Sequence, residues 1–162
     1  MPAKRARPTP TADAAEWLRL DRQLCFALYA GSLAMTKLYK PLLAPLGLTY
    51  PQYLVMLVLW EQDELAVSQL GERLSLDSGT LTPLLKRLEQ AGLLARRRDA
   101  ADERRVLVRM TAAGQALQAQ ALSIPTQLAC ASGCSLDELS TLTQRLQQLR
   151  EQLLQAQIPT AG

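Results

Sequence analysis

Cysteine and tyrosine are the residues of this chain whose side chains are most able to take part in chemistry. There are three cysteines, four tyrosines and no histidine. Cys25 lies on the apolar stripe of "LDRQLCFALYAGS", one helical turn before Tyr29. A free cysteine in such a stripe is most often packing, since it behaves as a small hydrophobe. The alternative is redox chemistry, because a thiolate reacts with peroxides.

The absence of histidine excludes several kinds of site. Ser–His and Cys–His catalytic pairs and imidazole acid–base chemistry are impossible without it. Three cysteines per chain leave an incomplete nitrogen and sulfur ligand set for zinc. We therefore expect no metal and no cofactor, and no structural disulfide framework in a chain without an apolar leader.

Length and composition predict one domain with extended helical arms. The chain has 162 residues, of which 48 % are hydrophobic and 20 % charged. Charged residues interrupt every apolar stretch, so no membrane span is expected. The proline-rich start, 1–12, reads as a disordered basic arm and not as a secretory signal, which favours a cytoplasmic protein.

The region 13–48 predicts helices for dimerisation and sensing. Asp13 is the expected N-cap of a first helix that contains Cys25. A second, shorter helical segment follows, broken by Pro41 and Pro45.

The region 49–111 predicts a winged helix-turn-helix. Thr49 is the expected cap of a helix, and two shorter helical patterns follow at about 67–74 and 78–91. Apolar and charged residues then alternate on both sides of "RDAADER", which is typical of a two-stranded hairpin with a charged tip. A helix-turn-helix followed by such a hairpin is a winged helix.

The region 112–158 predicts two helices, the first capped by Thr111, with a kink or break at Pro125. A capping box of Ser135 and Glu138 opens the last helix, in which leucines recur every three or four residues. This stripe predicts packing against another helix, either within the chain or in the arm of a dimer.

Local charge points to nucleic acid more clearly than the net charge of +3 does. Between Lys86 and Arg109 there are eight basic and four acidic residues, an excess that favours phosphate binding. Short hydroxyl side chains and exposed N–H groups at the start of 78–91 suit phosphates and base edges. The alternative is a capped amphipathic helix with a solvated polar face. The residues expected to contact DNA are Ser78, Gly79, Thr80, Thr82, Lys86, Arg87, Arg98, Asp102, Arg104 and Arg105.

These elements and several longer stretches resemble the MarR family of dimeric winged-helix repressors, in its organic hydroperoxide resistance branch. The stretches are "LCFALYA", "MTKLYKPLL", "LTYPQYLVMLVLWE", "LDSGTLTPLLKRLEQAGL" and "DERRVLV". The resemblance covers about 17–155. It implies a mainly α-helical homodimer with a small β-wing, joined through its N- and C-terminal helices. Its recognition helices would enter successive major grooves of a pseudo-palindromic operator, with half-sites about 34–36 Å apart.

The resemblance also assigns roles to the reactive residues. Cys25 matches the peroxide-sensing position, and Tyr39 and Tyr50 match tyrosines whose hydroxyls bond the sulfur across the dimer interface. Tyr29 matches a third nearby aromatic. In the two-cysteine branch, oxidation continues to a disulfide with a resolving cysteine of the other subunit. The match favours Cys130 in that role over Cys134, which reads as a spare thiol or an alternative resolver.

The family's substrates carry fatty or aromatic bodies, so the resemblance also implies an apolar cavity beside Cys25. The candidate lining residues, for which plain core packing is the alternative, are Leu24, Phe26, Leu28, Met56 and Trp60.

Two other functions compete with peroxide sensing. One is a repressor of the same family that releases DNA on non-covalent binding of a phenolic or drug-like ligand, with Cys25 as filler. The other is a thiol peroxidase, although no catalytic motif of such an enzyme is present. Redox repression remains the prediction, with double-stranded operator DNA, a second copy of the chain and organic hydroperoxides as partners, and no membrane.

Overall fold

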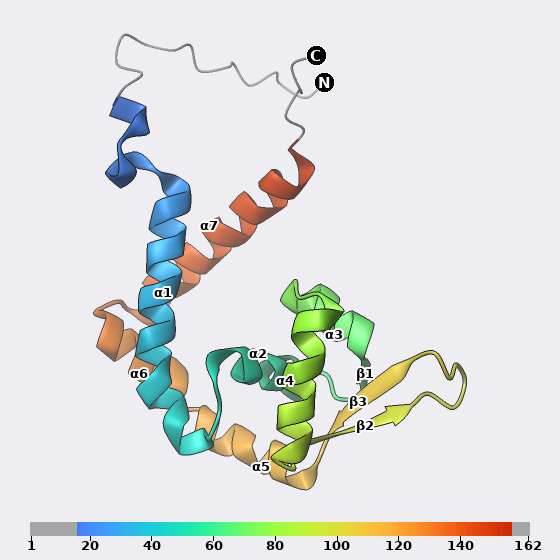
Figure 1. Cartoon of the computed structure of the whole chain (residues 1–162). Coiled ribbons are helices and arrows are strands. Elements are labelled where there is room, and N and C mark those ends of the chain that lie inside the picture. Colours follow the sequence, from blue (N-terminus) through green and yellow to red (C-terminus); the bar gives the residue numbers. More distant parts are fainter. Residues whose placement is uncertain (1–15, 157–162) are drawn as a thin grey trace, which may run out of the picture. The chain divides into compact units, whose positions relative to one another are not determined.

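Helices make up most of the structure, a computed structural model that describes residues 16–156 (Figure 1). The α-helices are α1 Leu24–Leu43, α2 Tyr50–Glu61, α3 Val67–Leu74, α4 Ser78–Gln90, α5 Ala112–Ala121, α6 Ile124–Ser132 and α7 Leu136–Gln155. The strands are β1 Leu65–Ala66, β2 Leu94–Arg98 and β3 Val106–Met110. The chain divides into two units, one ending at Lys37 and one beginning at Leu38, and each is described by itself. The basic arm expected over 1–12 and the predicted cap Asp13 lie outside the described residues.

The expected first helix is wrong over 16–23. Two 3-10 turns occupy Glu16–Leu18 and Leu20–Arg22, and the α-helix begins only at Leu24. Polar side chains in this stretch bond locally, as in the ion pair of 2.7 Å between Arg22 Nη2 and Glu16 Oε1. Such local bonds offer the backbone an alternative to the helical ladder.

The expected break at Pro41 is also wrong, because α1 continues through it to Leu43. Proline in a helix removes one backbone hydrogen bond. Here the loss falls in the last turn, where the fully buried Leu43 anchors the helix end. After the helix the chain forms a 3-10 turn at Ala44–Leu46. Gly47, which has a φ of 66°, ends this turn.

The three helices expected within 49–111 form where the sequence places them. Thr49 caps α2, and its N–H donates to Gln52 Oε1 at 2.9 Å. Asp77 caps α4. Leu81, Leu85 and Leu88 of α4 are at most 1 % exposed, and they anchor this helix in the core.

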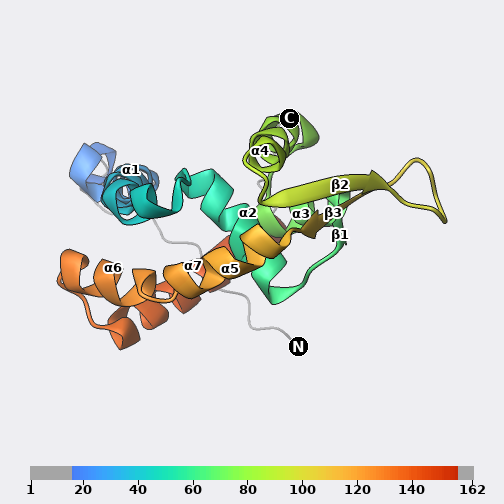
Figure 2. The ribbon, with the colours of Figure 1, turned by 90° about the horizontal axis from the view of Figure 1, so that it is seen from below.

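The wing is an antiparallel hairpin of β2 and β3, as predicted, and β3 also pairs with β1 in a sheet of order β1-β3-β2. Figure 2 shows β2 and β3 extending beyond β1 into a long loop. The two-residue strand β1 was not expected, because so short a segment shows no alternation of apolar and polar residues. Asp63 secures the base of the wing by accepting a 2.8 Å hydrogen bond from Met110 N.

The last three helices confirm the predicted caps and break. Thr111 caps α5, Pro125 lies in the first turn of the separate helix α6, and the capping box of Ser135 and Glu138 opens α7. No residue of α7 is buried within this chain. Most of its leucine stripe is therefore exposed in the single chain, which favours the reading as a dimer arm.

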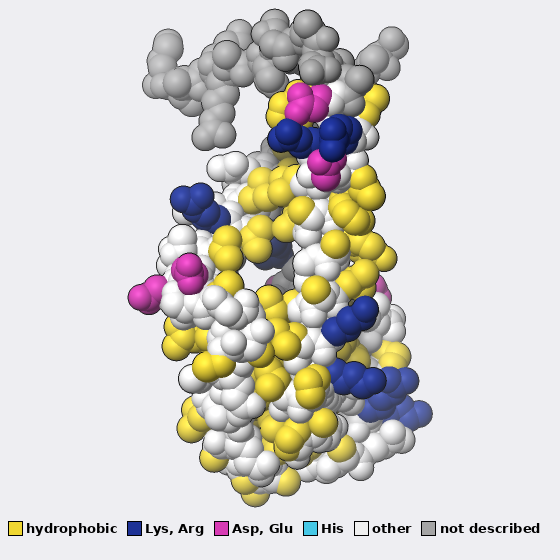
Figure 3. Space-filling view, turned by 90° about the vertical axis from the view of Figure 1, so that its left-hand side faces the viewer, with side chains coloured by type: hydrophobic (Ala, Val, Ile, Leu, Met, Phe, Trp, Pro, Cys, Tyr) yellow, Lys and Arg dark blue, Asp and Glu magenta, His cyan; other side chains and the backbone are white. Residues whose placement is uncertain are grey.

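Apolar side chains are also exposed around α1. Trp17 and Leu18 before the helix are 66 % and 84 % exposed, and Leu24 and Leu33 within it are 55 % and 49 % exposed. Figure 3 shows one exposed face on which apolar side chains gather. Exposed apolar clusters of this extent mark interaction surfaces.

Among the described helices, none taken singly has the length and apolar character needed to cross a bilayer. A pair of segments, Leu24–Leu46 and Tyr50–Glu61, meets that requirement only together, across a bend of 66°.

Gly114 provides a test of the packing between α5 and the wing. A Cβ at this position would lie 2.1 Å from the carbonyl oxygen of Leu93, which is backbone and cannot move aside. We expect Gly114→Ala to lower the free energy of unfolding by about 2–4 kcal/mol, measured by urea denaturation. Ala116→Ser, at an exposed position of the same helix, is the control and should change it by less than about 0.5 kcal/mol. Equal stability of the two variants would contradict the close approach.

Candidate nucleic-acid interface and thiol sites

Helix α4 presents one polar face to solvent. Ser78, Gly79, Thr80 and Thr82 are exposed, as are Lys86 and Arg87 further along the helix. The opposite face is the buried leucine face described above. The predicted residues of the recognition helix are thus brought together on one accessible surface.

The first turn of α4 is capped by a carboxylate, so the N–H group of Thr80 is not free to bind phosphate. Asp77 Oδ1 accepts from Thr80 N at 2.8 Å, and Asp77 Oδ2 accepts from Thr80 Oγ1 at 3.0 Å. These hydrogen bonds hold the pKa of Asp77 below its ordinary value. Gly79 leaves room for the cap, since a Cβ there would lie 3.1 Å from Asp77 Oδ1.

Ion pairs divide the basic residues of this region into two groups. Arg96 is tied to Glu89 of α4, with its Nη2 2.6 Å from Glu89 Oε2, and Arg97 pairs with Glu64. Lys86, Arg87 and Arg98 have no ion pair among the described residues. The unpaired cations are the ones best able to bind phosphate.

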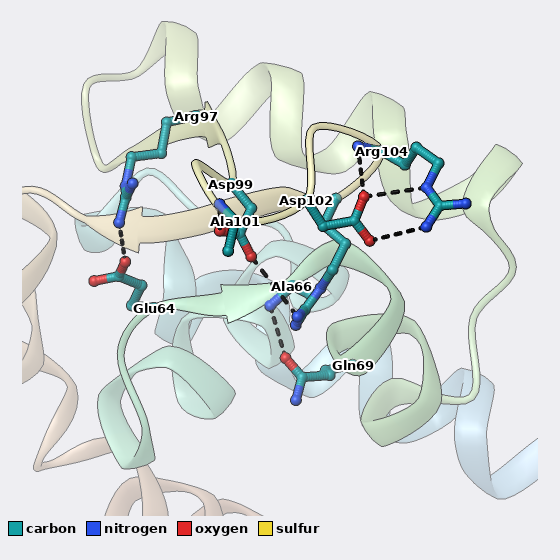
Figure 4. Close-up of polar contacts among 9 residues, drawn as sticks. Glu64, Ala66, Gln69, Arg97, Asp99, Ala101, Asp102 and Arg104 are labelled. Atoms are coloured by element: carbon teal, nitrogen blue, oxygen red, sulfur yellow. Dashed lines mark hydrogen bonds and ion pairs between the residues drawn. The ribbon is translucent and has the colours of Figure 1, made fainter.

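The tip of the wing is ordered by its own acidic residues (Figure 4). Asp102 Oδ1 accepts a charge-assisted hydrogen bond from Arg104 Nε at 3.1 Å. This bond lowers the pKa of Asp102. Asp99 pairs with Arg105 at 3.7 Å. The Arg104 side chain remains 91 % exposed, so it is held in direction and still accessible.

A hollow of about 360 Å³ lies where the wing meets the recognition helix. Thr82 of α4 and Arg96, Arg104 and Arg105 of the wing line it. It joins the two predicted DNA-contacting elements into one basic surface.

Three tyrosines cluster where the end of α1 meets α2. The ring centroids of Tyr39 and Tyr50 lie 4.6 Å apart, and those of Tyr39 and Tyr53 lie 5.9 Å apart. Burial raises the pKa of all three phenols, that of Tyr39 to about 12. Neutral O–H groups are therefore available as hydrogen-bond donors here. Tyr53 was missed by the sequence analysis, although its spacing of three from Tyr50 on a helix is the signal for a shared face.

The three cysteines are free thiols that differ in access. Cys25, in the N-terminal unit, and Cys130, near the end of α6, are exposed, whereas Cys134 is partly buried. Cys134 Sγ lies 3.8 Å from the carbonyl oxygen of Ser132. Tyr29 is 62 % exposed.

Two of the proposed cavity-lining residues belong to the packed core. Met56 is fully buried, and the indole N–H of Trp60 donates to the carbonyl oxygen of Gly114 at 3.0 Å. Leu24, Phe26 and Leu28 are instead exposed in this chain. Over 16–156, no group of three or more histidine, cysteine, aspartate and glutamate side chains is placed to hold a metal ion.

A helix-turn-helix with a basic wing defines a winged-helix DNA-binding protein. Comparison with known proteins agrees. The family model for the transcriptional regulator SarA/Rot matches residues 37–120. The organic hydroperoxide resistance transcriptional regulator of Bacillus subtilis (strain 168) is 51 % identical, over 85 % of this chain and 94 % of its own length.

Solved structures resemble the fold as well. Reduced AbfR bound to DNA is 37 % identical with a TM-score of 0.71, covering 86 % of this chain and 98 % of its own. Disulfide-formed AbfR is 36 % identical with a TM-score of 0.60, covering 88 % and 97 %. AbfR is a protein of Staphylococcus epidermidis. This chain belongs to the MarR family of winged-helix transcriptional regulators, in the branch of the organic hydroperoxide resistance regulators.

The raised pKa of Tyr39 predicts a late step in alkaline titration. A phenol whose pKa is higher in the folded than in the unfolded chain stabilises the fold fully below pH 10.0, and that contribution is lost as pH rises through about 12. We expect the tyrosinate absorbance of the native protein to rise later than that of the urea-unfolded protein. Tyr39→Phe should remove the latest native step, and its persistence in that variant would refute the assignment.

Proposed function

We propose that this chain is a peroxide-sensing repressor that binds operator DNA as a homodimer when reduced. An organic hydroperoxide oxidises Cys25 to a sulfenic acid and then to an intersubunit disulfide, and the protein leaves the DNA. The observation that carries the proposal is the combination of an accessible Cys25 with a separate cluster of neutral tyrosine hydroxyls, in a chain built around an exposed recognition helix.

DNA binding is supported by the surface shared by α4 and the wing. The polar face of α4 suits the major groove, while Arg98, Arg104 and Arg105 lie on a thin projecting hairpin that suits a minor groove. The similar protein AbfR has been solved bound to DNA in its reduced form.

Dimerisation is supported by the exposed apolar faces of α1 and α7. We assign 13–48 and 112–158 to the dimer and 49–111 to DNA. Tyr39 and Tyr50 hydroxyls that bond the Cys25 sulfur would come from the second subunit, as the resemblance to the organic hydroperoxide resistance regulators implies.

The chemistry needs only the hydroperoxide and two thiols. The Cys25 thiolate attacks the peroxide O–O bond and gives a sulfenic acid and an alcohol. Hydrogen bonds from Tyr39 and Tyr50, with Tyr29 as a third neighbour, favour the thiolate without a histidine. A resolving thiol then displaces water and forms the disulfide. Cys130 fits that role better than Cys134, because it is exposed while the Cys134 thiol is partly buried.

Movement of α7 can be transmitted to the turn before the recognition helix through a side-chain hydrogen bond. Arg150 Nη2 of α7 donates to Ser75 Oγ at 2.5 Å, and Ser75 lies in the turn before the recognition helix. A disulfide requires Cα atoms within about 7 Å, so closing one across subunits displaces any helices held further apart. We place the protein in the cytoplasm and regard it as a regulator that is oxidised once per reduction, not a peroxidase.

The redox assignment predicts opposite responses of DNA binding to a hydroperoxide for the wild type and for Cys25→Ser. Cumene hydroperoxide should abolish operator binding by the wild type in a gel shift, and dithiothreitol should restore it. Cys25→Ser should bind DNA and stay bound, because no sulfenic acid forms.

Non-reducing electrophoresis should show a covalent dimer for the wild type and for Cys134→Ser, but not for Cys130→Ser. Release of Cys25→Ser by the hydroperoxide would instead favour the non-covalent ligand mechanism.

The free cations predict the salt dependence of DNA binding. Each phosphate contact contributes about 0.9 to the slope of log affinity against log salt concentration. Lys86→Met and Arg98→Met should each reduce the slope by about 1. Arg97→Met is the control, since Glu64 already neutralises that guanidinium. An equal loss of slope in all three variants would show that the ion pairs do not select the phosphate-binding residues.

A further inference from the structure

The two threonines on the exposed face of α4 donate their hydroxyl hydrogens within the chain. Thr80 Oγ1 lies 3.0 Å from Asp77 Oδ2, and Thr82 Oγ1 lies 2.7 Å from the carbonyl oxygen of Ser78. A carboxylate and a carbonyl only accept hydrogen bonds, so the threonine is the donor in both pairs. A hydroxyl group carries one hydrogen, and in both threonines that hydrogen already forms a hydrogen bond within the chain.

What remains on each hydroxyl is acceptor capacity only. A phosphate oxygen is also an acceptor, so neither threonine can hydrogen-bond the DNA backbone while these bonds persist. In the major groove the donors on base edges are the N6 amino group of adenine and the N4 amino group of cytosine. The exposed methyl groups can contact the C5-methyl group of thymine.

We propose that Thr80 and Thr82 are specificity residues that accept hydrogen bonds from adenine or cytosine amino groups, and that they do not anchor phosphates. This rests on the proposed DNA binding and adds to it the chemical class of base edge that α4 reads. The case is strongest for Thr80, because its bond to an ionised carboxylate is charge-assisted and a backbone N–H fixes the same carboxylate.

Ser78 provides the internal contrast on the same turn. Its side-chain hydroxyl makes no hydrogen bond to any described residue of the chain, so it keeps a hydrogen to donate to a phosphate. The polar face of α4 is thus divided into base-reading threonines and a phosphate-binding serine.

The test couples protein variants to single-group changes in the DNA. Duplexes selected from a randomised library by the reduced wild-type protein supply the probe. Each adenine is replaced in turn by purine and each cytosine by 2-pyrimidinone, which removes one amino group, and single phosphates are replaced by methylphosphonates. Affinities are measured for the wild type, Thr80→Val, Thr82→Val, Thr80→Ser and Ser78→Ala, each verified as folded by circular dichroism.

At one or more positions in each half-site, removal of an amino group should weaken wild-type binding about fivefold, and should weaken the matching valine variant less than twofold. Thr80→Ser should behave as the wild type, because it keeps the hydroxyl. Ser78→Ala should lose its sensitivity to a methylphosphonate and keep its sensitivity to amino groups.

Two outcomes overturn the inference and leave DNA binding intact. One is undiminished sensitivity of both valine variants to every amino group, and the other is coupling of either threonine to a methylphosphonate. Failure of the reduced wild type to bind or select any duplex would instead overturn the proposed function itself.

Discussion

Burial of one face of α4 is the constraint on which the rest of the structure depends. Leu81, Leu85 and Leu88 lie at helical spacing, and removing them from water fixes the rotation of the helix about its axis. Once that rotation is set, Thr80, Thr82 and Lys86 must face solvent. The reading surface is therefore the complement of the core, and a polar substitution among the leucines would displace it.

Charge then refines what hydrophobic burial has positioned. Asp77, Asp102 and Glu89 each neutralise or direct a neighbouring donor at the edge of the basic surface. The result is fewer free cations than the sequence contains, and each ordered arginine points in a defined direction. Ordering before binding lowers the entropy that must be lost when the wing meets a duplex.

The apolar faces of α1 and α7 bear on association between chains and not on contact with DNA. A single chain leaves them exposed, while Tyr39, Tyr50 and Tyr53 are partly desolvated against one another. In the proposed dimer the same association that covers the apolar faces would bring a thiol to phenols of a second subunit. Stability and peroxide sensing would then depend on one interface, so a change of sulfur chemistry there is felt by the whole assembly.

Most of the local structure was predictable because its causes are local. The caps at Thr49, Asp77, Thr111 and Ser135, and the hairpin around the wing, follow from side chains within a few residues of each other. The errors occur where a longer-range or competing contact prevails. The residues before Leu24 form hydrogen bonds among themselves and do not join the helix. Helix α1 continues through Pro41 because the buried Leu43 anchors its end. Strand β1 forms because it pairs with β3.

By itself, then, the sequence determined the class of fold and the position of the recognition helix, since periodicity and residue type encode these directly, and it predicted which residues react. Only the tertiary structure decided which arginines have no ion pair among the described residues and which hydroxyl groups already donate a hydrogen bond within the chain. It also decided that Tyr53 packs with Tyr39 and Tyr50. These properties depend on distances between atoms, and the linear order of residues does not specify such distances until the chain has packed.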